Sequence, residues 1–150
     1  AELAGSYGLR VAAEFVPLSS VKTISEMAAL VREVDAPNLG ILIDVYHWQR
    51  SGASLDAVAA LPPEWLSMLH LCDCPAAAPA DLEALRTEVR EHRLYVGEGD
   101  AAITVLVALL PPDAVLAIEQ PHLDRLRTLG AAEYAARSLR TARAVVDPAS

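Results

Sequence analysis

Four short apolar runs, each followed by helix-like sequence, constrain the fold more than any other feature of this chain. The runs cover residues 9–17, 39–45, 65–73 and 113–121. Helical patterns are predicted over 20–34, 54–61, 80–91, 101–110 and 131–146, with Ser19 or Ser20 as the cap of the first. Strands that alternate with helices predict an α/β fold with a parallel sheet and right-handed crossovers.

Composition narrows the class of protein. The chain has 150 residues and 53 % hydrophobic content, which predicts one domain over 1–150 with a sizeable core. A net charge of -8 argues against a nucleic-acid partner and against an anionic membrane. No apolar run is long enough to span a membrane, and no signal peptide is recognisable, so we expect a cytoplasmic protein. Cys72 and Cys74 are expected to be reduced, and a metal held by this Cys-x-Cys pair would lack a second cysteine pair.

Each predicted strand has an ionisable residue at or near its carboxyl end. These residues are Glu14, Asp44, His70 and Glu119. The carboxyl ends of parallel strands meet at one edge of a sheet, so the four side chains are expected to converge. Three converging carboxylates repel one another, and a divalent cation relieves that repulsion. Oxygen and imidazole donors suit Mn²⁺, Mg²⁺, Co²⁺ or Zn²⁺ without selecting among them.

A structural interpretation stands beside this one. A single Asp or Glu at a strand end commonly caps the next helix or faces solvent in a turn. A lone histidine such as His70 is commonly a hydrogen-bonded structural residue. The metal hypothesis therefore depends on all four residues occurring at equivalent places in four successive strands.

With these residues identified, the chain resembles the xylose isomerase-like barrel superfamily, which contains sugar isomerases and epimerases and a family of apurinic-site endonucleases. The matching pieces are Glu14 after an apolar strand, "DVYH" at 44–47, "HLCD" at 70–73, "GEGD" at 97–100 and Glu119 before Pro121. The resemblance implies a (β/α)₈ TIM barrel, of which this chain supplies the last four βα units. A whole barrel needs about 250 residues.

The resemblance also implies roles for particular residues. Glu14, Asp44, His70 and Glu119 are expected to be the metal ligands, with Glu14 and Glu119 also serving as acid and base on opposite faces of the substrate. The metal would hold adjacent substrate oxygens and polarise the carbonyl, stabilising an enediolate while a glutamate removes the α-proton. His47 would bond a substrate hydroxyl or carbonyl; the alternative is an exposed loop histidine.

The sequence departs from the epimerase pattern after the third strand. Epimerases of this group often have an arginine six residues after the strand histidine, where this chain has Ala76. Arg93 or Arg50 is expected to replace it in binding substrate, unless each is a surface charge. Trp48 and Trp65 are candidate pocket walls, although packing against helices is the other role considered for Trp65. Glu98 is expected either at the pocket mouth or in a solvated loop.

These inferences predict a divalent-metal-dependent isomerase or epimerase that acts on a small sugar or polyol. The alternatives are a non-catalytic half-barrel that retains a relic metal site, and an endonuclease-like enzyme, which would need more histidines and a basic surface. Half a barrel exposes two sheet edges and an apolar inner face, which predicts association with a second copy or with a missing N-terminal half. The chain is accordingly interpreted as an excised fragment, a natural truncation or a self-pairing half-barrel.

Overall fold

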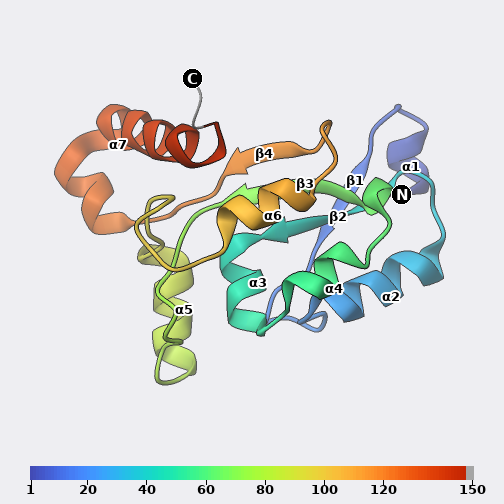
Figure 1. The fold of residues 1–150 in the computed structure, drawn as a ribbon, viewed down its shortest axis with the longest axis horizontal. Helices are drawn as coiled ribbons and strands as arrows, with labels where there is room; N and C mark the ends of the chain where they lie inside the picture. The colour runs from blue at the N-terminus through green and yellow to red at the C-terminus, as the bar shows by residue number, and fades with distance from the viewer. Residues whose placement is uncertain (148–150) are drawn as a thin grey trace.

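The computed structural model describes residues 1–147, and these form a four-stranded parallel sheet (Figure 1). The strands are β1 (Val11–Glu14), β2 (Leu39–Asp44), β3 (Leu66–Leu71) and β4 (Val115–Ile118), in the spatial order β1-β2-β3-β4. Each strand therefore lies beside its neighbour in the sequence, and a crossover that contains helix joins each pair. The predicted fold class, an α/β half-barrel of four βα units, is confirmed.

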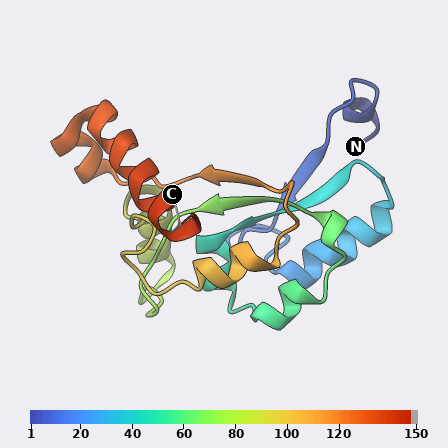
Figure 2. The same ribbon diagram turned by 45° about the horizontal axis from the view of Figure 1, so that its top comes forward.

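Helices connect the strands, and one further helix lies at each end of the chain. They are α1 (Glu2–Gly5), α2 (Ile24–Val34), α3 (Val45–Ser51), α4 (Leu55–Ala59), α5 (Leu82–Glu91), α6 (Ile103–Leu109) and α7 (Leu123–Val146), with a 3-10 turn at Pro63–Trp65. Figure 2 shows α2, α4 and α6 along one face of the sheet. Among residues 1–147, no helix has both the length and the apolar character needed to cross a membrane.

The core lies between the sheet and this helical layer. All six residues of β2 are buried, as its nearly continuous apolar sequence predicts. Ile41 and Ile43 are fully buried and belong to the same apolar cluster as Met27 and Val31 of α2. β2 lies between two other strands and packs against the helical layer. These contacts fix the position of the backbone at its carboxyl end, where Asp44 lies.

The start of α2 differs from the prediction. The helix begins at Ile24, four residues after Ser20, with Thr23 as its N-cap. The Thr23 hydroxyl accepts the Glu26 N–H at 3.2 Å, and the Glu26 carboxylate accepts the Thr23 N–H at 3.2 Å. This reciprocal pair satisfies two backbone donors at once, which a single serine cap does not, so the Ser19 or Ser20 cap was wrong.

Two helices were not predicted. α3 begins directly at the end of β2, although the sequence suggested a strand through residue 45, and it stops at Gly52, whose positive φ of 69° suits glycine. The long element α7 also starts eight residues before the predicted helix at 131. Gly130 has φ 73° and ψ 161°, so α7 consists of two helices, and only the second follows the predicted range.

Candidate metal centre at the carboxyl end of the sheet

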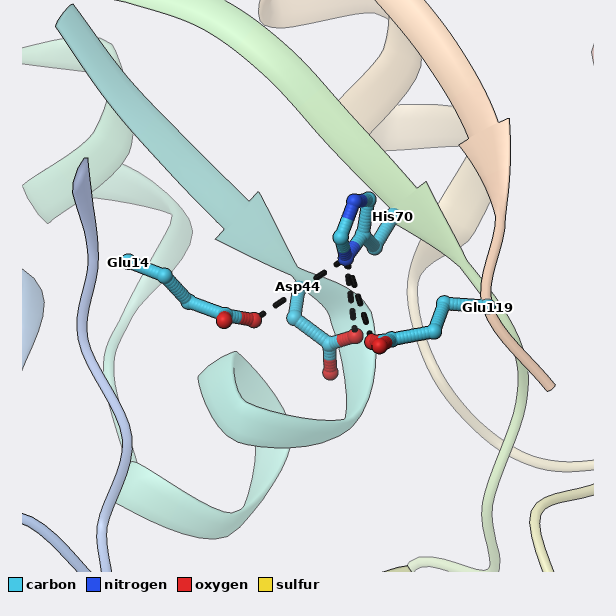
Figure 3. A group of neighbouring side chains, drawn as sticks. All are labelled: Glu14, Asp44, His70 and Glu119. Carbon is cyan, nitrogen blue, oxygen red and sulfur yellow. Dashed lines mark hydrogen bonds and ion pairs between the residues drawn. The ribbon is translucent and has the colours of Figure 1, made fainter. Parts of the chain in front are cut away.

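The four strand-end residues converge in the structure. One ligand atom from each of Glu14, Asp44, His70 and Glu119 lies within 4.8 Å of the other three. Figure 3 shows Glu14 and Glu119 approaching from opposite sides, with Asp44 and His70 between them. The sheet register explains this arrangement, since Asp44 pairs with His70 across β2 and β3, and Glu119 directly follows β4.

Asp44 uses its two carboxylate oxygens for different purposes. Oδ1 accepts the His47 N–H at 2.9 Å and thereby caps α3. Oδ2 faces the other site residues and lies 3.8 Å from Nδ1 of His70. This fully buried aspartate therefore caps a helix and also lies in the cluster, while its role as a metal ligand stays a prediction.

Glu14 is a carboxylate whose surroundings oppose its negative charge. Burial raises its pKa to about 7, and the charges of Asp44 and Glu119 add to the rise. Its Oε1 atom is buried and has no hydrogen-bond partner among the described residues. A buried carboxylate oxygen without a hydrogen-bond partner destabilises the folded chain unless the oxygen binds a proton or a cation.

His70 lies at the centre of the cluster. Its Nδ1 atom is 3.1 Å from Oε2 of Glu119 and 4.0 Å from Oε1 of Glu14. Three carboxylates and one imidazole are the donors that Mn²⁺, Mg²⁺, Co²⁺ and Zn²⁺ accept, and they lie close enough to share one ion after small rotations of their side chains. The donor set and the orphaned Glu14 oxygen therefore fit a divalent cation.

Arg93 enters the same cluster. Its guanidinium is 4 % exposed, and Nη1 donates to Asp44 Oδ2 at 2.7 Å and to Glu119 Oε2 at 3.2 Å. Burial by itself lowers the pKa of this guanidinium, but the Asp44 and Glu119 charges raise it above its ordinary value. Arg93 is thus a permanent cation in contact with two of the four strand-end residues, and the interpretation of it as a surface charge was wrong.

A loop anchored by Asp73 brings Arg93 to the sheet edge. Asp73 and Leu94 exchange two backbone hydrogen bonds, at 3.1 Å and 2.9 Å, so the segment after α5 returns to lie beside the end of β3. The Asp73 carboxylate is 1 % exposed and accepts four backbone N–H groups, including those of Gly97 and Gly99. The glycines of "GEGD", which the sequence offered only as part of the family resemblance, therefore supply backbone donors for this anchor.

His47 and Trp48 lie on α3, next to the cluster. His47 is 6 % exposed, so the exposed-loop interpretation was wrong, and its Nε2 lies 3.9 Å from Oε1 of Glu14. Burial lowers the pKa of His47 to about 4, and Arg93 adds to the decrease, so the ring is neutral at pH 7. Trp48 is 5 % exposed and packs within the apolar core. Substrate contacts by Arg93, His47 and Trp48 stay predictions.

The other candidates lie in other contacts. Arg50, the second arginine considered for substrate, pairs with Glu88 of α5 at 2.9 Å. Glu98 pairs with Arg125 and lies 3.8 Å from Arg137. The two cysteines are free and buried, and burial raises the pKa of Cys74 to about 12.

A hollow of about 890 Å³ lies at the opposite end of the sheet. Its walls include Arg10, Leu39 and Leu66, which are at or beside the amino ends of β1, β2 and β3. In parallel α/β barrels the chemistry occurs at the carboxyl ends of the strands, and residues at the amino ends serve stability. We therefore assign the candidate site to the Glu14–Glu119 cluster rather than to this hollow.

Comparison with known proteins agrees with the geometry. The model of the xylose isomerase-like TIM barrel family matches residues 1–143. The chain is 28 % identical over 114 residues to an inosose isomerase of Halalkalibacterium halodurans, which covers 73 % of this chain and 37 % of that protein. It is 29 % identical over 100 residues to a 3-dehydroshikimate dehydratase of Pseudomonas putida, covering 66 % of this chain and 15 % of that protein.

A solved structure gives the same fold. The crystal structure of the IolI protein with a bound zinc atom superimposes with a TM-score of 0.82 at 22 % identity, over 98 % of this chain and 52 % of that one. The chain thus spans about half the length of this barrel and less of the two curated relatives.

Proposed function

This chain belongs to the xylose isomerase-like TIM barrel family, and on that premise we propose that it carries the metal-binding and acid–base half of an isomerase or epimerase active site. The substrate is a sugar or polyol, and the reaction is proton transfer at the carbon next to a carbonyl. The observation that carries the proposal is the convergence of four donor atoms within 4.8 Å at the carboxyl ends of four strands.

Glu14, Asp44, His70 and Glu119 would hold one divalent cation. When bound, the cation polarises the substrate carbonyl and so acidifies the neighbouring C–H. Asp44 and His70 are the more enclosed pair, since Asp44 is fully buried and the His70 side chain is 19 % exposed. Their part is to fix the position of the ion rather than to exchange protons with solvent.

Glu14 and Glu119 are the acid–base pair. They stand at the two outer strands and approach the centre from opposite sides (Figure 3), so a substrate lying between them offers one face to each carboxylate. Burial and acidic neighbours raise the pKa of Glu14 to about 7 in the metal-free chain, and a bound cation would lower it again, so that Glu14 would be a carboxylate ready to accept a proton. One glutamate removes a proton from the substrate and the other returns a proton. Return to the opposite face of the same carbon inverts that carbon, and return to a neighbouring carbon moves the C–H bond.

His47 and Arg93 bind the oxygens of the substrate. A neutral His47 ring can donate one hydrogen bond to a hydroxyl or carbonyl, and its Nδ1 atom has no hydrogen-bond partner among the described residues. Arg93 offers fixed N–H groups beside Glu119. Trp48 is buried in the apolar core, and we assign it a packing role as a wall rather than a polar contact to substrate.

The relatives favour a cyclic polyol ketone as substrate. One of them is an inosose isomerase and another is a 3-dehydroshikimate dehydratase. Isomerisation and loss of water from a ketone can both begin with removal of a proton next to the carbonyl, which is the step that Glu14 or Glu119 performs here. A dehydratase is therefore the second candidate function, and the two differ in the fate of the carbanion.

Polypeptide outside these four strands would complete the pocket. β1 and β4 are the edges of the sheet in the described residues, and three apolar residues of β4 are exposed: Val115, Leu116 and Ile118. We propose that the edges pair with a second copy of this chain or with further strands of the same barrel type. A non-catalytic half-barrel remains the competing function, and the net charge of -8 disfavours an endonuclease.

Metal analysis tests the proposal first. Calorimetry with Mn²⁺ and Zn²⁺ should give one ion per chain, and Asp44→Asn and Glu119→Gln should each abolish binding while remaining folded. Deuterium uptake from D₂O into an inosose then detects proton removal even where turnover needs the rest of the barrel. If the chain bound metal but the inosose took up no deuterium even when the remaining strands of the barrel were supplied, the non-catalytic half-barrel would be favoured.

A further inference from the structure

Arg93 contacts the oxygens that the proposed cation needs. Nη1 is 2.7 Å from Asp44 Oδ2 and 3.2 Å from Glu119 Oε2, and it also donates to the Glu119 backbone carbonyl at 3.0 Å. The other oxygen of Asp44 is already committed to the His47 N–H. A cation that uses Asp44 must therefore share Oδ2 with Nη1, or take it.

The charges make this sharing unfavourable. A guanidinium and a divalent ion on the same carboxylate oxygens would lie only a few ångströms apart, and like charges at that separation repel each other strongly. Glu119 is the ligand that can move, since its side chain is 47 % exposed whereas Asp44 is fully buried. The Glu119 carboxylate is thus the place where Arg93 and the ion exclude each other.

We propose that Arg93 is a built-in competitor for the metal: it neutralises Asp44 and Glu119 when no ion is bound, and it must release the Glu119 carboxylate when an ion binds. Arg93 therefore weakens metal affinity and at the same time keeps the metal-free ligands in place. This inference rests on the proposed function, because it requires the cluster to bind a cation.

The rest of the side chain is held so that only its tip can move. Nε donates to the Val89 carbonyl at 3.1 Å, and the guanidinium carbon lies 5.1 Å from the centre of the Tyr46 ring. The backbone N–H of Arg93 bonds the Pro121 carbonyl at 3.1 Å. When the Glu119 carboxylate is released, Nη1 keeps its bonds to Asp44 Oδ2 and to the Glu119 backbone carbonyl, so the guanidinium stays beside the site.

The chain offers a matched control for Arg93. Arg50 has a side chain that is 2 % exposed, lies over the same Tyr46 ring at 5.2 Å, and forms a buried ion pair, but its partner is Glu88 of α5. Arg93→Gln and Arg50→Gln each remove one buried guanidinium from one face of this tyrosine. Only the first removes a cation from the proposed ligands.

The experiment is calorimetric titration of Mn²⁺ into wild type and both variants, with the Tm of each metal-free chain. We expect Arg93→Gln to bind Mn²⁺ about tenfold more tightly or better, from the loss of one nearby charge, and its metal-free Tm to fall. Arg50→Gln should lower Tm with unchanged affinity. Equal or weaker Mn²⁺ binding by Arg93→Gln would overturn the inference and leave the metal site intact. Absence of binding in wild type and in Arg93→Gln alike would sink the proposed function as well.

A second measurement covers the case in which Arg93→Gln does not fold. The Arg93 Nε–H resonance of ¹⁵N-labelled wild type, assigned by its loss in Arg93→Lys, should shift when diamagnetic Zn²⁺ is added, and its guanidinium rotation should accelerate. A Zn²⁺-bound protein in which this resonance does not change would show that Arg93 releases nothing.

Discussion

Oδ2 of Asp73 accepts the N–H of Gly99 at 3.0 Å, and a Cβ atom at position 99 would lie 2.5 Å from the other oxygen of the same carboxylate. The two residues are 26 positions apart, and their contact holds the loop that carries Arg93 against the end of β3. The loop can close this tightly only because residue 99 has no side chain.

The first prediction concerns this anchor. Asp73→Asn replaces one acceptor oxygen by an NH₂ group, which leaves two buried backbone donors facing a donor. We expect a loss of about 3–5 kcal/mol in unfolding free energy, measured by urea denaturation. Asp100→Asn is the control, since Asp100 lies in the same loop and accepts one N–H, from Ala76. An Asp73→Asn variant no less stable than Asp100→Asn would contradict the anchoring role.

The second prediction concerns pH and the metal-free chain. The folded pKa of Glu14 is raised from 4.5 to about 7, so the folded state holds the extra proton between these values. The contribution of Glu14 to stability is full below pH 4.5 and is lost as the pH rises to 7. Relative to wild type, Glu14→Gln should therefore gain about 2–3 kcal/mol between pH 4.5 and pH 7, with a chelator present.

His47 supplies the opposite sign as a control. Its pKa falls from 6.5 to about 4, so its contribution is present above pH 6.5 and is lost as the pH falls to 4. His47→Gln should lose stability relative to wild type as the pH rises through this range. If the two variants showed the same trend with pH, burial and charge at this cluster would have been misassigned.

The third prediction separates the two roles of Asp44. Asparagine is as good an N-cap as aspartate, so Asp44→Asn should retain α3, whereas Asp44→Ala should lose about a further 1 kcal/mol from the missing cap. Both variants should lose metal binding, because both remove the charged ligand and the partner of Arg93. Circular dichroism, denaturation and Mn²⁺ titration measure the three quantities. Metal binding retained by Asp44→Asn would remove this residue from the ligand set.

The fourth prediction concerns association. The β4 edge exposes 51 % of Val115 and 38 % of Ile118, which favours strand pairing with another copy. Light scattering after size exclusion should show a dimer or larger species at micromolar concentration. Val115→Lys with Ile118→Lys should reduce it, whereas Val105→Lys, at a 47 % exposed residue of α6, should not. A wild-type monomer at every concentration would count against pairing through this edge.

The sequence predicted the strands and their polar ends well because both signals are local. Four apolar runs with a polar residue at the end are visible without any knowledge of the tertiary fold, and parallel pairing then brings Glu14, Asp44, His70 and Glu119 together. α3 was missed because its helical sequence begins inside an apolar run, although Asp44 as cap and Gly52 as stop were available signals.

The position of Arg93 could not have been derived in the same way. It depends on where a long connection returns to the sheet, and that return is fixed by the Asp73 carboxylate and the backbone of residues 97–101. The family resemblance pointed to residue 76, which is an alanine, and left Arg93 and Arg50 as the candidates to replace it. Only the tertiary contacts show that Arg93, and not Arg50, lies in the cluster.

The two contacts of the Asp44 carboxylate limit which substitutions this position can accept during evolution. Oδ1 caps a helix and Oδ2 faces His70 and Arg93, so a substitution that preserves one of these contacts can still disrupt the other. Glutamate would move the carboxylate away from the His47 N–H, and serine would keep the cap but remove the charge. Asn, Ser or Thr at this position would keep the helix cap without the charge, so the residue found here in a related chain would indicate whether the proposed metal site has been kept.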